Sequence, residues 1–162
     1  MREILFRGKK YKTSVFDETD WAYGSLIDSG NHEQVAIYPL INGASTMSVK
    51  QLVYARMEPV NPDTVGQFTG LCDKNNQKIF EGDVVYVKYG AYNFDGSSVE
   101  HRAICGVIGY DTIGMLGVIV GWHKGTPTWS DFFNVLSLTD NIEDWSIEVI
   151  GNIHDNPELL SL

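Results

Sequence analysis

One stretch of the chain has the pattern of two β-strands joined by a polar turn. It reads Thr64-Val65-Gly66-Gln67-Phe68-Thr69-Gly70-Leu71, then Asp73-Lys74-Asn75-Asn76, then Ile79-Phe80-Glu81-Gly82-Asp83-Val84-Val85. β-Branched and aromatic residues are typical of strands, and Asp and Asn are typical of turns. The stretch therefore predicts a hairpin-like pair of strands, with an acidic corner opening the second strand, residues 83–89.

Further short strands are predicted on both sides of this stretch. Residues 4–7 indicate a strand, with Ile4 and Phe6 on one face and Leu5 and Arg7 on the other, and Gly8-Lys9-Lys10 then indicates a turn. The other predicted strands are residues 21–27, 34–38, 102–110, 115–122 and 147–153. Asn156-Pro157-Glu158-Leu159-Leu160 predicts a short helical tail with proline in its first turn. Short strands at this spacing, with few helices, indicate a mainly β protein built from small barrels or sandwiches.

Two prolines mark the predicted boundary between two modules. Pro59 and Pro62 interrupt the strand pattern, and proline is disfavoured inside a sheet because it lacks a backbone donor. A chain of 162 residues buries one core, or two small cores. We expect an N-terminal β module over residues 1–60 and a C-terminal module over residues 61–162.

Charge and composition bound the classes of function. The formal net charge is −9, and five of the 12 basic residues lie within the first 12 positions. Phosphate-backbone binding needs a basic footprint, so this acidity disfavours a nucleic-acid partner. Two cysteines, Cys72 and Cys105, are too few for a disulfide framework. Residues 1–7 do not resemble a signal peptide, and Ile104–Trp122 contains too many glycines for a membrane span. We expect a cytoplasmic protein without a membrane partner.

Three blocks of the sequence together carry a resemblance to a known family. They are Ile4-Leu5-Phe6-Arg7-Gly8-Lys9 with Trp21-Ala22-Tyr23-Gly24-Ser25-Leu26; the stretch between Thr64 and Val85 quoted above; and Glu148-Val149-Ile150-Gly151-Asn152-Ile153 with Asn156-Pro157-Glu158-Leu159-Leu160. In this order they resemble the YopX family of phage and prophage proteins. Asn76 departs from the glycine that the family usually has there, although asparagine also tolerates a left-handed turn. Residues 90–135 match nothing in the family pattern, and partner specificity is expected in that segment.

The resemblance implies a fold and a biological setting. It implies an N-terminal β pseudo-barrel and a C-terminal SH3-like barrel, in a phage-encoded accessory protein that acts inside a bacterium. It brings no catalytic residues that could be carried over to this sequence. A shared fold alone does not supply an activity.

The acidic and metal-like patterns in the sequence are better explained by turns than by a catalytic or metal-binding site. Glu81-Gly82-Asp83 is a candidate metal or general-base pair, but carboxylates at such a corner also accept backbone N–H bonds. Residues 73–84 lack the glycine and the terminal glutamate that a calcium loop requires. The histidines and cysteines do not show zinc-like spacing. We therefore predict a protein that is not an enzyme, with no catalytic residue, cofactor or metal.

Aromatic residues of the C-terminal module are the remaining functional candidates. They fill a core, line a groove for a peptide, or stack on single-stranded nucleic acid together with lysine. The predicted interaction surface is Tyr86, Lys88, Tyr89, Tyr92, Phe94, Trp122 and Trp129. We predict that the protein binds a host or phage protein. The alternative is a nucleic-acid-associated protein in phage replication or regulation, and homo-oligomer formation stays open.

Overall fold

The chain divides into two compact units, Met1–Phe68 and Thr69–Leu162. In the computed structural model, the described residues are 3–11, 21–39, 48, 50–51, 56–92, 99–110, 115–119, 122–123, 126–127, 132–134 and 146–161. The boundary between the units lies within one strand. The modules predicted as 1–60 and 61–162 stay a prediction, because compactness does not establish which segment folds independently.

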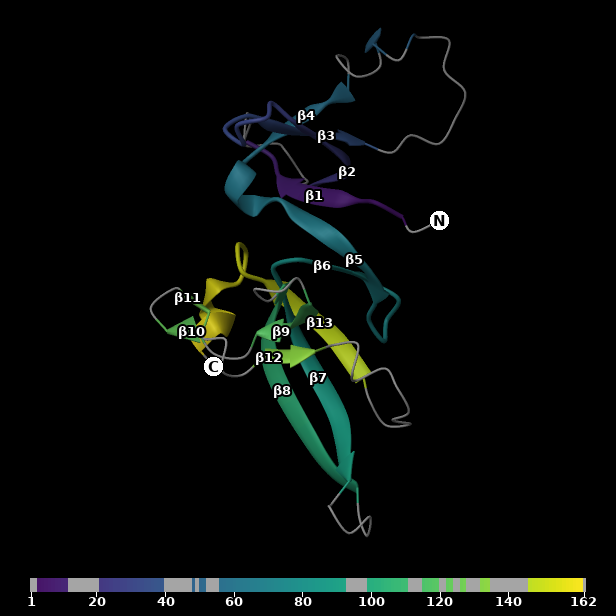
Figure 1. Cartoon of the computed structure of the whole chain (residues 1–162), viewed down its shortest axis with the longest axis vertical. Helices are drawn as coiled ribbons and strands as arrows, with labels where there is room; N and C mark the ends of the chain where they lie inside the picture. The colour runs from purple at the N-terminus through teal and green to yellow at the C-terminus, as the bar shows by residue number, and fades with distance from the viewer. Residues whose placement is uncertain are drawn as a thin grey trace. The chain divides into compact units, whose positions relative to one another are not determined.

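The described structure is mainly β, with two antiparallel sheets (Figure 1). One sheet has the strand order β4-β3-β2-β1-β5-β6, and the other has the order β12-β9-β8-β7-β13. The strands of the first are β1 (Phe6–Lys9), β2 (Trp21–Asp28), β3 (Val35–Pro39), β4 (Glu58–Val60), β5 (Gly66–Cys72) and β6 (Lys78–Phe80). Those of the second are β7 (Asp83–Tyr92), β8 (Val99–Tyr110), β9 (Leu116–Ile119), β12 (Phe132–Asn134) and β13 (Ser146–Asn152). β10 (Trp122–His123) and β11 (Thr126–Pro127) pair with each other. The predicted mainly β fold is confirmed.

The first unit buries its core on one face of β2, β3 and β4. Ala22, Val35, Ile37 and Val60 form this core, and Phe6, Leu26 and Val65 pack against it. After β4, the 3₁₀ helix η1 (Pro62–Thr64) is capped by Asn61, whose side chain accepts a hydrogen bond from the backbone N–H of Asp63. A hydrogen bond of 2.8 Å from Asn61 N to Lys9 O holds the chain after β4 against the last residue of β1. β4 thus comes back to the end of β1.

The predicted turn at Gly8-Lys9-Lys10 is wrong, because β1 continues through Lys9. Lys10 then forms an isolated antiparallel bridge with Val60. A Cβ atom on Gly8 would lie 2.8 Å from Cγ2 of Val60. The glycine therefore permits close packing between β1 and β4, and no turn is involved. Among the described residues, the only bridge between this end of the chain and β4 is the one at Lys10, so the sheet is not closed.

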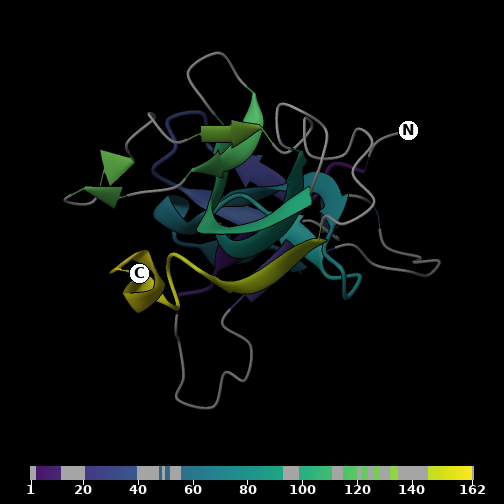
Figure 2. The same cartoon turned by 90° about the horizontal axis from the view of Figure 1, so that it is seen from below.

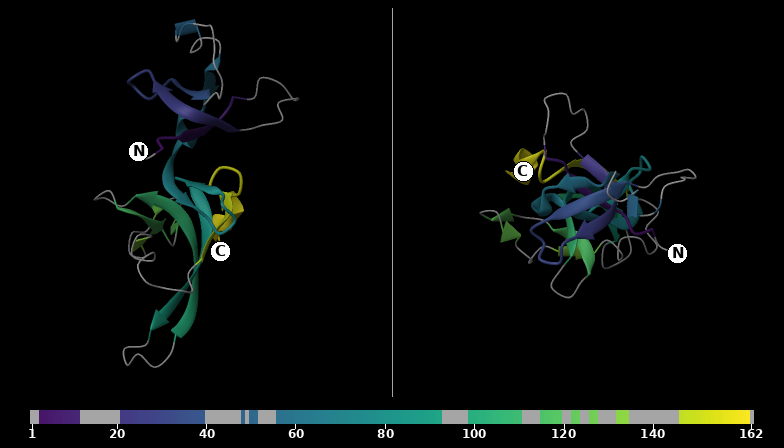
Figure 3. Two further views of the ribbon diagram at one scale, coloured as in Figure 1. Left: turned by 90° about the vertical axis from the view of Figure 1, so that its right-hand side faces the viewer. Right: turned by 90° about the horizontal axis from the view of Figure 1, so that it is seen from above.

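The second unit is built around the long pair of β7 and β8 (Figure 3). Its core consists of residues from five strands: Ile79, Val85, Val87, Ile108, Leu116, Val118 and Ile147. β13 pairs with β7 and contains a register shift between Val149 and Gly151. It leads through a turn into the 3₁₀ helix η3 (Pro157–Ser161), which confirms the predicted short helical tail (Figure 2).

Candidate functional site

The turn between β2 and β3 is organised by the carboxylate of Asp28. Its Oδ1 atom accepts hydrogen bonds from the backbone N–H groups of Gly30 at 2.8 Å and His32 at 3.3 Å. Its Oδ2 atom contacts Nδ1 of His32. Gly30 and His32 both adopt positive φ, of 95° and 58°. An Asx-type turn of this kind is what Asp followed by Ser and Gly favours, and it holds Asp28 at the end of β2.

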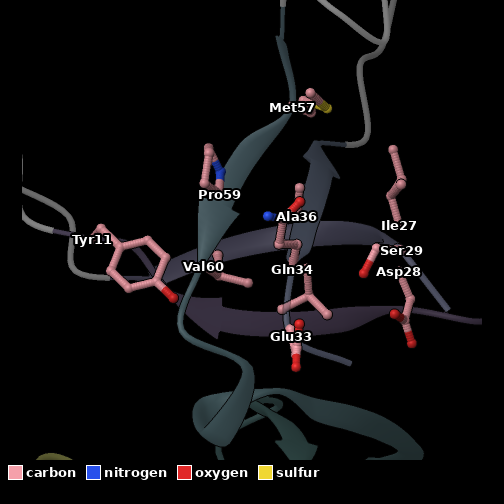
Figure 4. A pocket seen from close by; sticks show the side chains of 11 residues that line it. Tyr11, Ile27, Asp28, Ser29, Glu33, Gln34, Ala36, Met57, Pro59 and Val60 are labelled. Carbon is pink, nitrogen blue, oxygen red and sulfur yellow. The ribbon is translucent and has the colours of Figure 1, made fainter. Parts of the chain in front are cut away.

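A pocket of about 380 Å³ opens beside this turn, within the first unit (Figure 4). It is lined by Tyr11, Ile27, Asp28, Ser29, Glu33, Gln34, Val35, Ala36, Met57, Pro59 and Val60. The sheet register pairs Ile27 with Ala36, and Ala36 with Pro59. Directly paired residues share one face of a sheet, so these three side chains form a row across β2, β3 and β4. The small Ala36 between two larger neighbours leaves space in the row.

The rim of the pocket is both apolar and acidic. Tyr11 is 54% exposed and Met57 is 36% exposed, and Figure 4 shows them on different sides of the pocket. Within the described part of the chain, Asp28 and Glu33 are the charged residues that line it, and neither Lys nor Arg is found there. The hydrogen bond from Gly30, opposed by desolvation and aided by His32, lowers the pKa of Asp28 below its ordinary value. Asp28 is therefore negatively charged at neutral pH.

The strand that borders the pocket is poorly suited to pairing with another strand. β4 has three residues and lies at the end of its sheet. Pro59 has no backbone N–H to donate, and Val60 is already bridged to Lys10. The accessible part of this site is the space between side chains, and the backbone offers little to a partner.

Comparison with known protein families shows which family the chain belongs to. Residues 6–161 match the family model described as YopX protein. The chain belongs to the YopX family. No curated protein matches it. Both the pocket and the predicted aromatic surface lie within the part that matches the YopX family.

The structure brings together two residues of the predicted interaction surface. On β7, Val85 and Val87 are fully buried, so the alternate residues Tyr86 and Lys88 face away from that core. Nζ of Lys88 lies 5.8 Å from the centroid of the Tyr86 ring. The structure describes only the backbone of Tyr89 and Tyr92 in β7 and of Trp122 in β10. Phe94 and Trp129 lie outside the described residues.

The acidic corner before β7 has the structural role that was predicted. Oδ2 of Asp83 accepts a hydrogen bond of 2.8 Å from Phe80 N, and the Asp83 side chain is 1% exposed. Gly82 has a positive φ of 79°, which suits glycine. Its N–H donates to Ile108 O at 2.9 Å, and its carbonyl accepts from Ile153 N at 3.0 Å. The corner therefore ties β7 to β8 and to the segment after β13.

Asp73 holds the predicted turn between β5 and β6. Its Oδ1 atom accepts hydrogen bonds of 2.8 Å from the N–H groups of Asn75 and Gln77. Its Oδ2 atom accepts one of 3.2 Å from Val149 N, which lies in β13. Asn76 adopts a left-handed φ of 65°. The turn prediction, including the left-handed asparagine, is confirmed. The predicted pairing is wrong, because β6 follows the turn and residues 83–89 lie in β7 of the other sheet.

The stability of the protein should depend on the charge of Asp73. Burial raises the pKa of this carboxyl, but the hydrogen bonds from Gln77, Val149 and Asn75 together bring it below its ordinary value. Its contribution is therefore complete above the unfolded pKa of about 4 and is lost as the pH falls through the folded pKa. We expect the difference in unfolding free energy between the wild type and Asp73→Asn to be largest near neutral pH. Urea unfolding across a pH series checks this, and a difference that grows on acidification would contradict it.

The described residues contain few other candidates for a metal-binding or catalytic site. No group of three or more His, Cys, Asp or Glu side chains in the described ranges is arranged to hold a metal ion. Cys72 and Cys105 are free thiols, and burial raises the pKa of Cys105, which disfavours its reactive thiolate form. None of the helices in the described part of the chain has the length and apolar character needed to cross a bilayer.

Sequence reasoning missed the pocket. Its residues come from four separate segments, and none of them belongs to a recognised functional motif. The turn signal of Asp28, Ser29 and Gly30 marks one end of the site. The space itself depends on the register that sets Ala36 between Ile27 and Pro59, which composition and periodicity do not reveal.

Proposed function

We propose that this YopX-family protein is a phage- or prophage-encoded accessory protein that works by binding another protein and carries out no catalysis. We place this role in the cytoplasm of the bacterial host. The observation that carries the proposal is the open, largely apolar pocket of the first unit, with exposed Tyr11 and Met57 on its rim. Tyr and Met are enriched at protein–protein interfaces, and Met adapts its shape to a bound group.

The proposal includes a barrel-like architecture for each unit. In the first unit, the bridge between Lys10 and Val60 and the packing of Gly8 against Val60 support a pseudo-barrel. In the second, the N–H of Lys74 donates to Ile147 O at 2.9 Å, and Leu71 and Ile79 pack on the core that β7 and β13 share. These contacts join β5, β6 and their turn to β7 and β13 of the other sheet, and this close approach supports an SH3-like barrel.

A second interaction surface is proposed on the C-terminal unit. It comprises the aromatic set predicted from the sequence together with Lys88. The outward position of Tyr86 and Lys88 on β7 supports it. Glu148 pairs with Tyr86 in the neighbouring strand and forms an ion pair of 2.6 Å with Lys74. Glu148 therefore shares one face of the sheet with Tyr86.

Blocking the pocket is expected to release the partner. Ala36→Leu places a larger apolar side chain in the row between Ile27 and Pro59. Capture of the partner from nuclease-treated host lysate, quantified by mass spectrometry, should fall by about tenfold or more, equivalent to 1.4 kcal/mol of binding free energy. Ser25→Leu is the matched control, because Ser25 is exposed in β2 and is not among the lining residues.

The outcomes of this experiment separate the two proposed classes of function. A defined protein that is retained by the wild type and by Ser25→Leu, but not by Ala36→Leu, supports protein binding through the pocket. Equal retention by Ala36→Leu contradicts it. Retention that disappears with nuclease treatment, or recovery of nucleic acid itself, would favour the nucleic-acid alternative.

A further inference from the structure

We propose, building on the protein-binding function above, that the pocket receives an apolar side chain from a partner segment that carries Lys or Arg next to it. The apolar side chain of the partner, its anchor, would contact the apolar part of the pocket. Ile27, Ala36 and Pro59 form its row across the sheet, and Val35 and Val60 are buried beside them. A volume of about 380 Å³ lies at the low end of the range of roughly 300–1,000 Å³ for binding pockets, which suits one or two bulky side chains.

The charges at the rim of the pocket determine which charge the partner should carry beside its apolar anchor. Asp28 and Glu33 both line the pocket, and none of the described residues that line it is Lys or Arg. An acidic neighbour on the partner would meet like charge, and a basic one would meet opposite charge. Ionised carboxylates form short, strong hydrogen bonds with guanidinium and ammonium groups. The complementary partner segment is therefore basic beside its apolar anchor.

His32 is the internal competitor for this interaction. Its Nδ1 atom contacts Oδ2 of Asp28, and its side chain is 85% exposed. Glu33 has a neutral neighbour instead, since its Oε2 atom accepts a hydrogen bond of 2.7 Å from Nδ2 of Asn31. A contact to a side chain that is this exposed contributes little free energy, so a basic group of the partner can take the place of His32 beside Asp28.

The partner segment inserts side chains and does not add a strand to the sheet. Strand addition needs a free row of backbone donors and acceptors along an edge. At the edge strand β4, Pro59 lacks the donor and Val60 is occupied by its bridge to Lys10. Recognition at this site consequently rests on the anchor and the charge, and it should weaken as salt screens the carboxylates.

Selection from a random-peptide display library tests the chemistry of the partner. The full-length wild type and Ser25→Leu should enrich peptides in which Lys or Arg adjoins Leu, Ile, Met or Phe, and Ala36→Leu should not enrich them. A synthetic copy of an enriched peptide should bind about tenfold more weakly to the double variant Asp28→Asn, Glu33→Gln. Both replacements keep the oxygen that accepts the hydrogen bond within the turn, so the fold is retained.

Three results would overturn the inference: no enrichment, enriched peptides without an excess of basic residues, or unchanged affinity in the double variant. Failure of the inference is distinguishable from failure of the proposed function. If Ala36→Leu loses its natural partner while the selected peptides lack basic residues, the proposed protein binding is supported. The inference of a basic residue beside the anchor is then wrong. If Ala36→Leu keeps its natural partner, the proposal that a protein binds through this pocket is wrong.

Discussion

Replacing Asp73 with alanine is expected to destabilise the second unit by about 3 kcal/mol, because hydrogen bonds to a charged group contribute about 1.5–3 kcal/mol and orphaned buried donors add a penalty. The side chain is 7% exposed and accepts hydrogen bonds from the N–H groups of Asn75, Gln77 and Val149. The first two bonds hold the turn after β5, and the third joins that turn to β13, 76 positions along the chain. Loss of one side chain therefore weakens both the turn and its attachment to β13.

Lys74→Ala is the matched control for this prediction. Lys74 is the next residue in the same turn, and its ion pair with Glu148 lies at the surface, with side chains 46% and 34% exposed. Exposed ion pairs contribute about 0–1 kcal/mol, so this variant should unfold close to the wild type. Urea unfolding followed by tryptophan fluorescence measures both. An Asp73→Ala protein that unfolds at the same urea concentration as Lys74→Ala contradicts the assigned role.

Gly24→Ala should cost the first unit about 3 kcal/mol or more, at or beyond the upper end of the range for overpacking. A Cβ atom at this position would lie 1.9 Å from the carbonyl oxygen of Tyr38 and 2.9 Å from Cα of Pro39. Both atoms belong to the backbone of β3, so no change of side-chain rotamer relieves the overlap. The two strands would have to separate along their paired length.

The neighbouring Ser25→Ala provides the comparison for Gly24→Ala. Ser25 is exposed in the same strand, and surface substitutions of this kind usually change stability by less than about 0.5 kcal/mol. Hydrogen exchange in β2 and β3 should rise in Gly24→Ala and stay unchanged in Ser25→Ala. Equal protection in the two variants would show that the strands adjust to the added methyl group.

Local chemistry made the turns of the second unit predictable. The turn at Asp73 and the corner at Asp83 each depend on a carboxylate that accepts N–H bonds close by in the sequence, and residue type alone indicates such bonds. The outward position of Tyr86 and Lys88 follows from the alternation of β7. These features needed no knowledge of distant contacts.

Distant contacts decided the features that the sequence did not reveal. Gly8 has the residue type of a turn, yet it lies in β1 because Val60, more than 50 positions away, packs against it. The pocket likewise requires β4 to lie beside β3 and to end in its bridge to Lys10. Ala36 is an ordinary strand residue in the sequence, and its significance appears only between Ile27 and Pro59.

The central claim is that a partner protein docks at the pocket of the first unit, and site-specific photo-cross-linking in bacterial cells tests it most directly. The cross-linking residue p-benzoylphenylalanine would replace Met57 at the rim of the pocket or, as the control, Tyr23, which is exposed in β2 outside the lining. We expect a discrete adduct of higher mass from position 57, and none from position 23 or after Ala36→Leu is added. Adducts of equal yield from both positions, or none from position 57, would contradict the claim.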